Sequence, residues 1–190
     1  MPLRTHEVTL RDGEVVLRPL TEGDWDVLYR WNNDPEVLYF SEGDDIRSRT
    51  MEETKGLYAQ VSESAFMFMI EHGGIPVGEC WLQRMNLQRL LDLYRGKLLF
   101  RIDLSIGEKG LWGRGIGTRA VRLLTRFGFE ERGADMIFGL SIGDYNPRSL
   151  RTFRRAGYTL HGMYAQAPGA KGRFESDVVM TREGWEARKA

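Results

Sequence analysis

The sequence predicts a mixed α/β (α+β) fold, in which a central, mixed, mostly antiparallel sheet is flanked by helices. The length of 190 residues fits one domain. Segments with strand and helix periodicity are interleaved, and one alternating strand runs into a glycine-rich loop and an amphipathic helix. With 42% hydrophobic and 28% charged residues, the chain has the composition of a globular protein, which excludes a disordered or fibrous one.

The N-terminal half predicts short strands separated by helices. Thr21 and Thr50 each precede an acid by three residues, a capping-box spacing that predicts a helix start. The first helix should stop just before Pro35, because proline disfavours a helical conformation in the residue before it. A Gly73-Gly74 turn predicts a hairpin. The expected elements are a strand at 14–18, helices at 21–33 and 50–61, and strands at 66–70 and 77–82.

The C-terminal half adds a strand with clear alternation and two helices. Residues 98–106 alternate between apolar and polar side chains. Asn146 before Pro147 predicts a helix start, and Gly157 predicts its end. The other expected elements are a short inserted helix at 86–94, a helix at 118–131, strands at 136–142, 158–161 and 175–180, and a loop at 163–174.

The charges balance overall but are segregated along the chain. A net charge of zero argues against nonspecific binding to nucleic acid. Residues 34–53 contain seven acids and two bases, whereas residues 109–126 contain five bases and no acid. Either these runs are solvated faces, or they bind one cationic and one anionic ligand at different places.

Signals for membranes, secretion and metals are missing from the sequence. The longest apolar run, residues 65–70, is far too short to span a bilayer, and the N-terminal residues contain no apolar signal region. One cysteine and three scattered histidines argue against a metal site. We therefore expect a cytoplasmic protein with no membrane partner and no metal.

The loop Gly113-Arg114-Gly115-Ile116-Gly117 lies between a predicted strand and a predicted helix. Its glycines let the backbone approach a ligand, and the helix N-terminus favours an anion such as a pyrophosphate. The loop lacks the Gly-Lys-Ser/Thr ending of a Walker A site. A Rossmann domain does not fit, because only about 70 residues follow the loop. The alternative is a tight strand–helix turn without a ligand.

Residues 100–162 resemble the core of the GNAT superfamily of acetyl-CoA-dependent N-acetyltransferases. In that family an Arg/Gln-x-x-Gly-x-Gly/Ala loop binds the CoA pyrophosphate, and Trp112 stands at its first position here. The Trp-Gly-Arg-Gly-x-Gly variant is similar to the subgroup containing ribosomal-protein N-terminal acetyltransferases and aminoglycoside 6′-N-acetyltransferases. The resemblance implies one domain over 1–190 with an acetyl-CoA-binding core at about 98–162. The implied acetyl-CoA contacts are Ile106, Trp112, Gly113, Arg114, Gly115, Ile116, Gly117, Thr118, Asn146, Ser149 and Phe153.

Two carboxylates are candidates for the base that N-acetylation requires. Asp103 lies on the polar face of the strand at 98–106, and Ile102-Asp103-x-x-Ile106-Gly107 resembles the aminoglycoside-type enzymes, whose aspartate acts as base or amine anchor. The alternative for Asp103 is an ion pair with Arg101. Glu79, in the preceding strand, is the second candidate, and its alternative is a solvent-facing strand glutamate.

The general acid departs from the family pattern. Many members have a tyrosine where this chain has Phe153, which cannot donate a proton. Tyr145 is a candidate replacement, as are water and the ammonium formed during attack, and a core or cap role is the alternative for Tyr145.

The acceptor is expected to be a cation, because Glu42, Asp44 and Asp45 make the segment at 33–53 acidic. Trp81 is expected to line the acceptor cleft, with core packing as its alternative.

The predicted function is direct acetyl transfer to a primary amine of an aminoglycoside- or polyamine-like molecule. The alternatives are an N-terminal protein acetyltransferase with a peptide acceptor and a non-catalytic acyl-CoA-binding module. The leucines of the helix at 86–94 suggest core packing first and a homodimer contact second.

Overall fold

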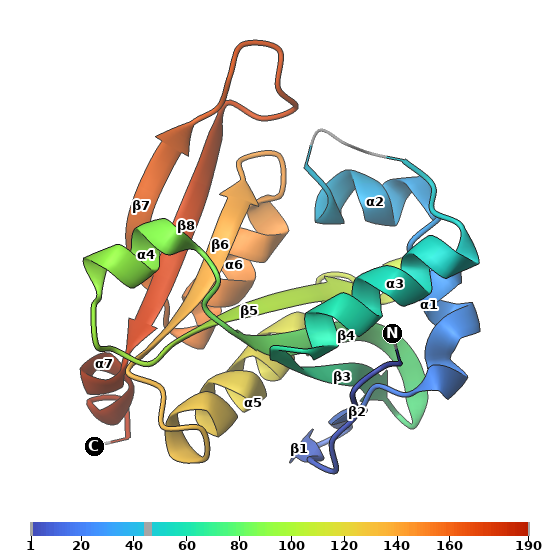
Figure 1. Ribbon diagram of the computed structural model, residues 1–190, viewed down its shortest axis with the longest axis horizontal. Helices are drawn as coiled ribbons and strands as arrows, with labels where there is room; N and C mark the ends of the chain where they lie inside the picture. The colour runs from blue at the N-terminus through green and yellow to red at the C-terminus, as the bar shows by residue number, and fades with distance from the viewer. Residues whose placement is uncertain (1, 44–46, 190) are drawn as a thin grey trace.

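A computed structural model describes residues 2–43 and 47–189. In this part of the chain eight strands form one sheet, in the order β1-β2-β3-β4-β5-β6-β8-β7 (Figure 1). Neighbouring strands are antiparallel except β5 and β6, which are parallel, so the predicted mixed sheet is confirmed. The strands are β1 (Leu10–Asp12), β2 (Val15–Pro19), β3 (Ala65–His72), β4 (Ile75–Arg84), β5 (Leu99–Ile106), β6 (Met136–Gly143), β7 (Thr159–Ala165) and β8 (Phe174–Thr181).

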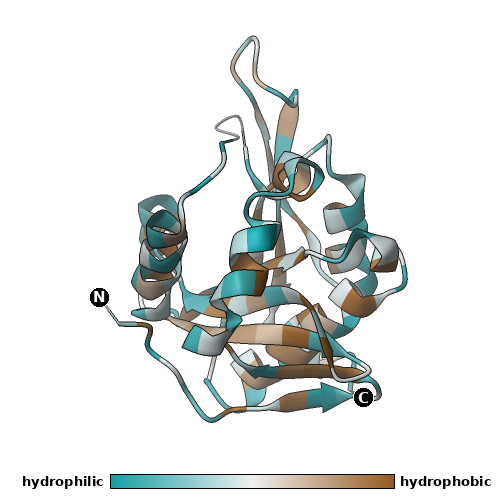
Figure 2. Cartoon of the chain, turned by 90° about the vertical axis from the view of Figure 1, so that its right-hand side faces the viewer, coloured by the Kyte–Doolittle hydropathy of each residue, from teal (hydrophilic) through white to brown (hydrophobic). Residues whose placement is uncertain are grey.

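Helices cover both faces of the sheet. α5 and α6 pack on one face, over the largest apolar cluster. On the other face α1 and α3 cover β3 and β4, whereas α4 covers β6 and β8. Figure 2 shows apolar residues along the strands between these layers. The helices are α1 (Trp25–Trp31), α2 (Pro35–Ser41), α3 (Met51–Ser62), α4 (Gln88–Leu93), α5 (Ile116–Glu130), α6 (Pro147–Ala156) and α7 (Arg182–Glu186). None within the described residues has the length and apolar character to cross a bilayer.

Local hydrogen bonds set the predicted helix ends. Thr50 Oγ1 accepts the Glu53 N–H at 3.1 Å, and Glu53 Oε2 accepts the Thr50 N–H at 2.8 Å, which confirms the capping box of α3. Asn146 Oδ1 accepts the Ser149 N–H at 3.2 Å at the start of α6. The helix ends at Gly157, whose φ of 102° suits glycine.

The sequence prediction was wrong between α1 and α3, where it expected no helix. Pro35 begins α2, and Asp34 Oδ1 accepts the N–H groups of Glu36 at 2.9 Å and Val37 at 3.2 Å. Proline restrains the residue before it but fits the first turn of a helix, so one Asp-Pro pair separates two helices. The edge strand β1 and the helix α7 were also missed, and β7 extends to Ala165, into the loop predicted at 163–174.

The parallel strands β5 and β6 pair over only three residues each, from Leu99 with Met136 to Arg101 with Phe138. Beyond this point β6 bulges between Gly139 and Ile142 in its pairing with β8. Ser141, inside the bulge, has a φ of 51° and is the single non-glycine residue with a positive φ among the described residues. The bulge turns β6 away from β5 and opens the sheet at the carboxyl end of β5.

A buried carboxylate supports this bulge. Asp177 on β8 is 0% exposed, and its Oδ1 accepts the Ser141 N–H at 2.9 Å. Its Oδ2 accepts a hydrogen bond from the Arg89 guanidinium of α4 at 2.5 Å. Asp177 therefore replaces the strand hydrogen bond that the bulge removes, and it ties α4 to the sheet.

We expect Asp177→Ala to destabilise the fold by about 2 kcal/mol, because the Ser141 N–H loses its acceptor inside the protein. Urea unfolding measures this loss. The matched control is Asp92→Ala, which removes an exposed carboxylate of α4 that lies 3.7 Å from Arg95, and its unfolding midpoint should stay within error of the parent. Equal midpoints for the parent and Asp177→Ala would contradict the role given to Asp177.

Candidate active site

The glycine loop turns the chain from β5 into α5 with backbone conformations that favour glycine. Gly113 and Gly115 have φ values of 79° and 84°, and Gly115 is the N-cap of α5. A Cβ at Gly117 would lie 3.3 Å from Leu104 Cδ1, so α5 packs closely against β5. The N–H groups of the first turn of α5 have no partner within the helix, which makes this end of α5 a place for an anion.

A cleft of about 260 Å³ lies between this loop, α2, the end of β5 and α6. Nine of the predicted acetyl-CoA contacts line it: Ile106, Trp112, Gly113, Gly115, Ile116, Gly117, Thr118, Asn146 and Ser149. Two do not. Arg114 is exposed on the outside of the loop, and Phe153 is buried with its ring on Gly139 and Tyr158.

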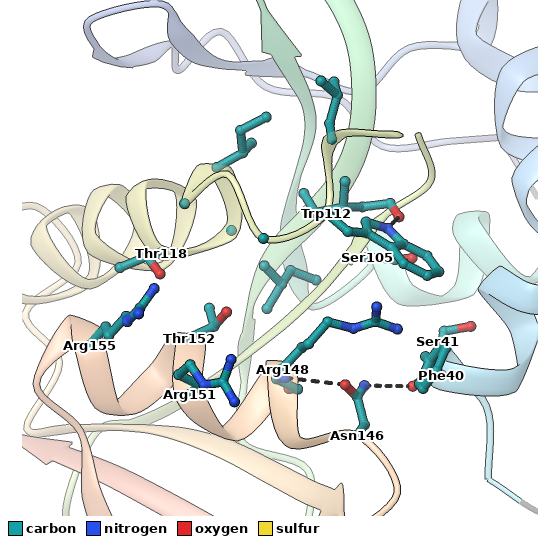
Figure 3. A pocket seen from close by; sticks show the side chains of 18 of the residues that line it. Phe40, Ser41, Ser105, Trp112, Thr118, Asn146, Arg148, Arg151, Thr152 and Arg155 are labelled. Atoms are coloured by element: carbon teal, nitrogen blue, oxygen red, sulfur yellow. Dashed lines mark hydrogen bonds between the residues drawn. The ribbon is translucent and has the colours of Figure 1, made fainter. Parts of the chain in front are cut away.

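Three arginines that the sequence analysis missed also line the cleft. Arg148, Arg151 and Arg155 extend from α6 toward the glycine loop (Figure 3). Their spacing of three and four residues places them on one helix face, and this periodicity was available in the sequence. The guanidinium of Arg148 lies 4.2 Å from the ring centroids of both Phe40 and Trp112. Arginines suit phosphate oxygens, so the cleft offers side-chain cations as well as helix N–H groups to an anion.

A second cavity of about 450 Å³ lies beside the cleft. The two share lining residues from α2, the end of β5 and α6, namely Val37, Phe40, Ser41, Leu104, Ser105, Asn146 and Ser149. They therefore adjoin where β5 parts from β6. Asn146 holds α2 at this junction, because its Nδ2 donates to the Phe40 carbonyl at 2.9 Å (Figure 3).

Asp103 lies in the second cavity, but its carboxylate is already engaged. Arg101 donates to it twice, at 2.6 and 2.8 Å, and Trp81 Nε1 donates at 3.1 Å. The ion pair that was the alternative for Asp103 is thus present, with both side chains on the cavity wall. Asp103 and Trp81 both line the second cavity.

Glu79 faces the same cavity and is 7% exposed, so the alternative of a solvent-facing glutamate is wrong. Burial raises the pKa of its carboxyl to about 7. A hydrogen bond from the Tyr58 hydroxyl acts in the opposite direction but is the smaller effect. Among the described residues Oε2 of Glu79 has no hydrogen-bond partner. A carboxyl that titrates near neutral pH beside a cavity has the properties of a general base.

Tyr145 and Phe153, the two residues considered for the general acid position, both line the second cavity. The Tyr145 hydroxyl donates to the Glu42 carbonyl at 3.2 Å. Phe153 contributes only an apolar wall. Asp44 and Asp45, predicted to bind the acceptor, lie outside the described residues, whereas Glu42 from the same segment lines the cavity and pairs with Arg49 at 3.3 Å.

Comparisons with known proteins agree with this geometry. A model of the acetyltransferase (GNAT) domain matches residues 14–159. Aminoglycoside N(6′)-acetyltransferase type 1 from Klebsiella pneumoniae is 24% identical over 197 residues, covering 96% of this chain and 90% of that protein.

Two solved structures have the same fold. AAC(6′)-Ib in complex with ribostamycin and coenzyme A has a TM-score of 0.74 at 21% identity, covering 93% of this chain and 98% of that one. Spermidine N-acetyltransferase from Vibrio cholerae in complex with CoA and spermine has a TM-score of 0.73 at 15% identity, covering 92% and 99%. The chain belongs to the GNAT acetyltransferase family and is an N-acetyltransferase with acetyl-CoA as its acetyl donor.

Proposed function

We propose that the protein acetylates a primary amine of a small cationic molecule, of the aminoglycoside or polyamine type, by direct attack on acetyl-CoA in a ternary complex. One observation carries the proposal: a cavity with the carboxylates Glu42, Glu79 and Asp103 adjoins a cleft lined by arginines and a glycine loop. The similarity to an aminoglycoside N(6′)-acetyltransferase and to a spermidine N-acetyltransferase supports the same acceptor class. The proposal treats residues 1–190 as one catalytic domain.

Acetyl-CoA is assigned to the cleft. Its pyrophosphate would bind the N–H groups of the glycine loop, with the α6 arginines Arg151 and Arg155 supplying positive charge. Its pantetheine arm would run between the end of β5 and Asn146, toward the second cavity. Because β6 no longer pairs with β5 beyond Arg101, the edge of β5 there offers backbone N–H groups to the oxyanion of the tetrahedral intermediate.

The acceptor is assigned to the second cavity, with its ammonium between Glu79 and Asp103. Glu79 removes a proton from the ammonium, and the neutral amine attacks the thioester carbonyl. Attack leaves a positive charge on the nitrogen. The tetrahedral intermediate then expels the CoA thiolate as the C–S bond breaks, the thiolate accepts a proton from a side-chain donor, and that donor regains a proton from the charged nitrogen, while Glu79 releases its own proton to solvent. Phe153 cannot supply this proton. Tyr145, which lines the same cavity, is the side chain we assign to it.

The test of the proposed function is release of CoA from acetyl-CoA in the presence of polyamines, aminoglycosides, free amino acids and N-terminal peptides. We expect release with polyamines or aminoglycosides and none above background with amino acids. Release with peptides alone would overturn the proposed acceptor class. Tight acetyl-CoA binding with no acceptor-stimulated release would instead favour the acyl-CoA-binding module.

Glu79→Gln should lower kcat by about a hundredfold, the contribution typical of a general base. In the parent, kcat/KM should rise with pH through about 7 as Glu79 loses its proton, and this dependence should vanish in the variant. Initial rates from pH 5.5 to 9 with a fixed acceptor measure it.

Asp103→Asn is compared with Glu79→Gln. It should raise KM for the acceptor and keep the dependence of kcat/KM on pH that the parent has. Urea unfolding of each variant checks that it is folded. Burial of Glu79 favours its neutral form, so the parent loses stability as pH rises from 4.5 to about 7. Glu79→Gln should therefore be at least as stable as the parent at pH 8. An unchanged pH profile in Glu79→Gln would remove Glu79 as the base.

Arg151→Ala should weaken acetyl-CoA binding about tenfold, because one charge-assisted phosphate contact is worth about 1.5 kcal/mol. Arg154→Ala is the matched control: it removes the same charge from an exposed position of α6 that does not line the cleft. Calorimetric titration with acetyl-CoA measures both, and equal affinities of the two variants would show that α6 does not hold the phosphates.

A further inference from the structure

The turn between β7 and β8 places one lysine at the end of α2, next to residues that line the second cavity. Residues 166–173 form this turn, beside the end of α2 at the top of Figure 1. The Lys171 ammonium donates to three backbone carbonyls at the C-terminal end of α2. They are those of Tyr39, Glu42 at 2.8 Å and Gly43 at 3.3 Å. A primary ammonium has three N–H donors, and backbone carbonyl oxygens suit them as acceptors.

Two aromatic rings also lie close to this ammonium. The Lys171 Nζ lies 4.5 Å from the ring centroid of Tyr39 and 3.9 Å from that of Tyr145. The two rings stand nearly edge to face, with centroids 6.0 Å apart. Aromatic faces and carbonyl oxygens together are a typical site for an alkylammonium. We call the group of Tyr39, Tyr145 and the carbonyls of Tyr39, Glu42 and Gly43 the ammonium cage.

The cage shares three residues with the cavity that holds the proposed acceptor carboxylates. Glu42, Gly43 and Tyr145 line that cavity together with Glu79 and Asp103. A molecule with one amine at Glu79 can therefore extend a second amine along the same cavity toward the cage. This arrangement matches the chemistry of a diamine or polyamine.

The turn does not depend on Lys171 alone for its position. Asp144 Oδ1 accepts the Arg173 N–H at 3.1 Å. Gly172 lies so close to the β6–α6 connection that a Cβ there would be 2.6 Å from Asp144 Oδ1 and 2.9 Å from Tyr145 Cδ1. The backbone of the turn is thus held by its own contacts, and the long Lys171 side chain is able to leave the cage without moving the turn.

We propose that the ammonium cage is a second cation-binding subsite of the acceptor cavity, occupied in the free protein by Lys171 and taken over by the distal ammonium of a diamine or polyamine acceptor. The inference rests on the proposed function. Lys171 carries the same alkylammonium group as the end of a polyamine, so the chain itself shows which group the cage binds. As an intramolecular competitor, Lys171 weakens the binding of diamines and leaves monoamines unaffected.

Lys171→Met tests this subsite, because it keeps the apolar stem and removes the ammonium. The probes are α,ω-diaminoalkanes and monoaminoalkanes of matched length. We expect KM for the best diaminoalkane to fall about tenfold, given an effective concentration of a tethered group in the millimolar range. KM for the matched monoaminoalkane and kcat for both should not change. Arg173→Met is the matched control, since it removes a cation from the same turn, and it should alter neither KM.

A second variant tests whether the tighter use of the diaminoalkane comes from the ammonium cage. Adding Tyr39→Leu to Lys171→Met removes one aromatic face of the cage and should return the diaminoalkane KM toward the parent value. The proposal is overturned if Lys171→Met raises the diaminoalkane KM, leaves it unchanged, or changes both amine classes equally. A higher diaminoalkane KM in Lys171→Met would mean that Lys171 is a structural contact between the turn and α2.

Calorimetric titration of the same diaminoalkanes separates this proposal from the proposed function. Tighter diaminoalkane binding by Lys171→Met than by the parent supports the cage even if no alkylamine is acetylated, in which case the proposed acceptor class fails and the subsite stands. Equal diaminoalkane affinities overturn the subsite, whether or not amines are acetylated.

Discussion

The site depends on the way two parallel strands separate. β5 and β6 share three residue pairs and then diverge, because β6 bulges at Ser141 and Asp177 supplies the hydrogen bond that the bulge removes. If β5 and β6 stayed paired along their whole length, the sheet would separate the face covered by α5 and α6 from the opposite face. The divergence instead lets the cleft on one side adjoin the cavity on the other, where the proposed function places the thioester and the amine.

Strand β5 also separates charges of opposite sign. The glycine loop and the α6 arginines lie on one side, and Glu79 and Asp103 lie on the other. The two carboxylates differ in their surroundings. Asp103 is held by Arg101 and Trp81, whereas Glu79 is buried with an unpartnered oxygen in the described structure. Under the proposed function, environment rather than residue type assigns one carboxylate to anchoring a cation and the other to accepting a proton.

Helix α2 links both ligand sites, since Val37, Phe40 and Ser41 line the cleft and the cavity alike. A partner far away in sequence holds it, because Asn146 donates to the Phe40 carbonyl, and the Lys171 ammonium lies at the helix end. In both contacts a nitrogen of a side chain, the Asn146 amide or the Lys171 ammonium, donates to backbone oxygens of this helix segment. Under the proposed function, acceptor recognition depends on how α2, α6 and the β7–β8 turn meet.

Short-range signals in the sequence determined most strands and helices, the capping box of α3, the start of α6 at Asn146 and the glycine loop, because each depends on residues close together in the chain. The resemblance carried by that loop identified the family. The tertiary structure decided the rest. Only folding brings Lys171 to Tyr39, buries Glu79 enough to raise its pKa, and shows that Asp34-Pro35 both ends one helix and begins another. Burial and long-range pairing depend on neighbours that local sequence patterns do not encode.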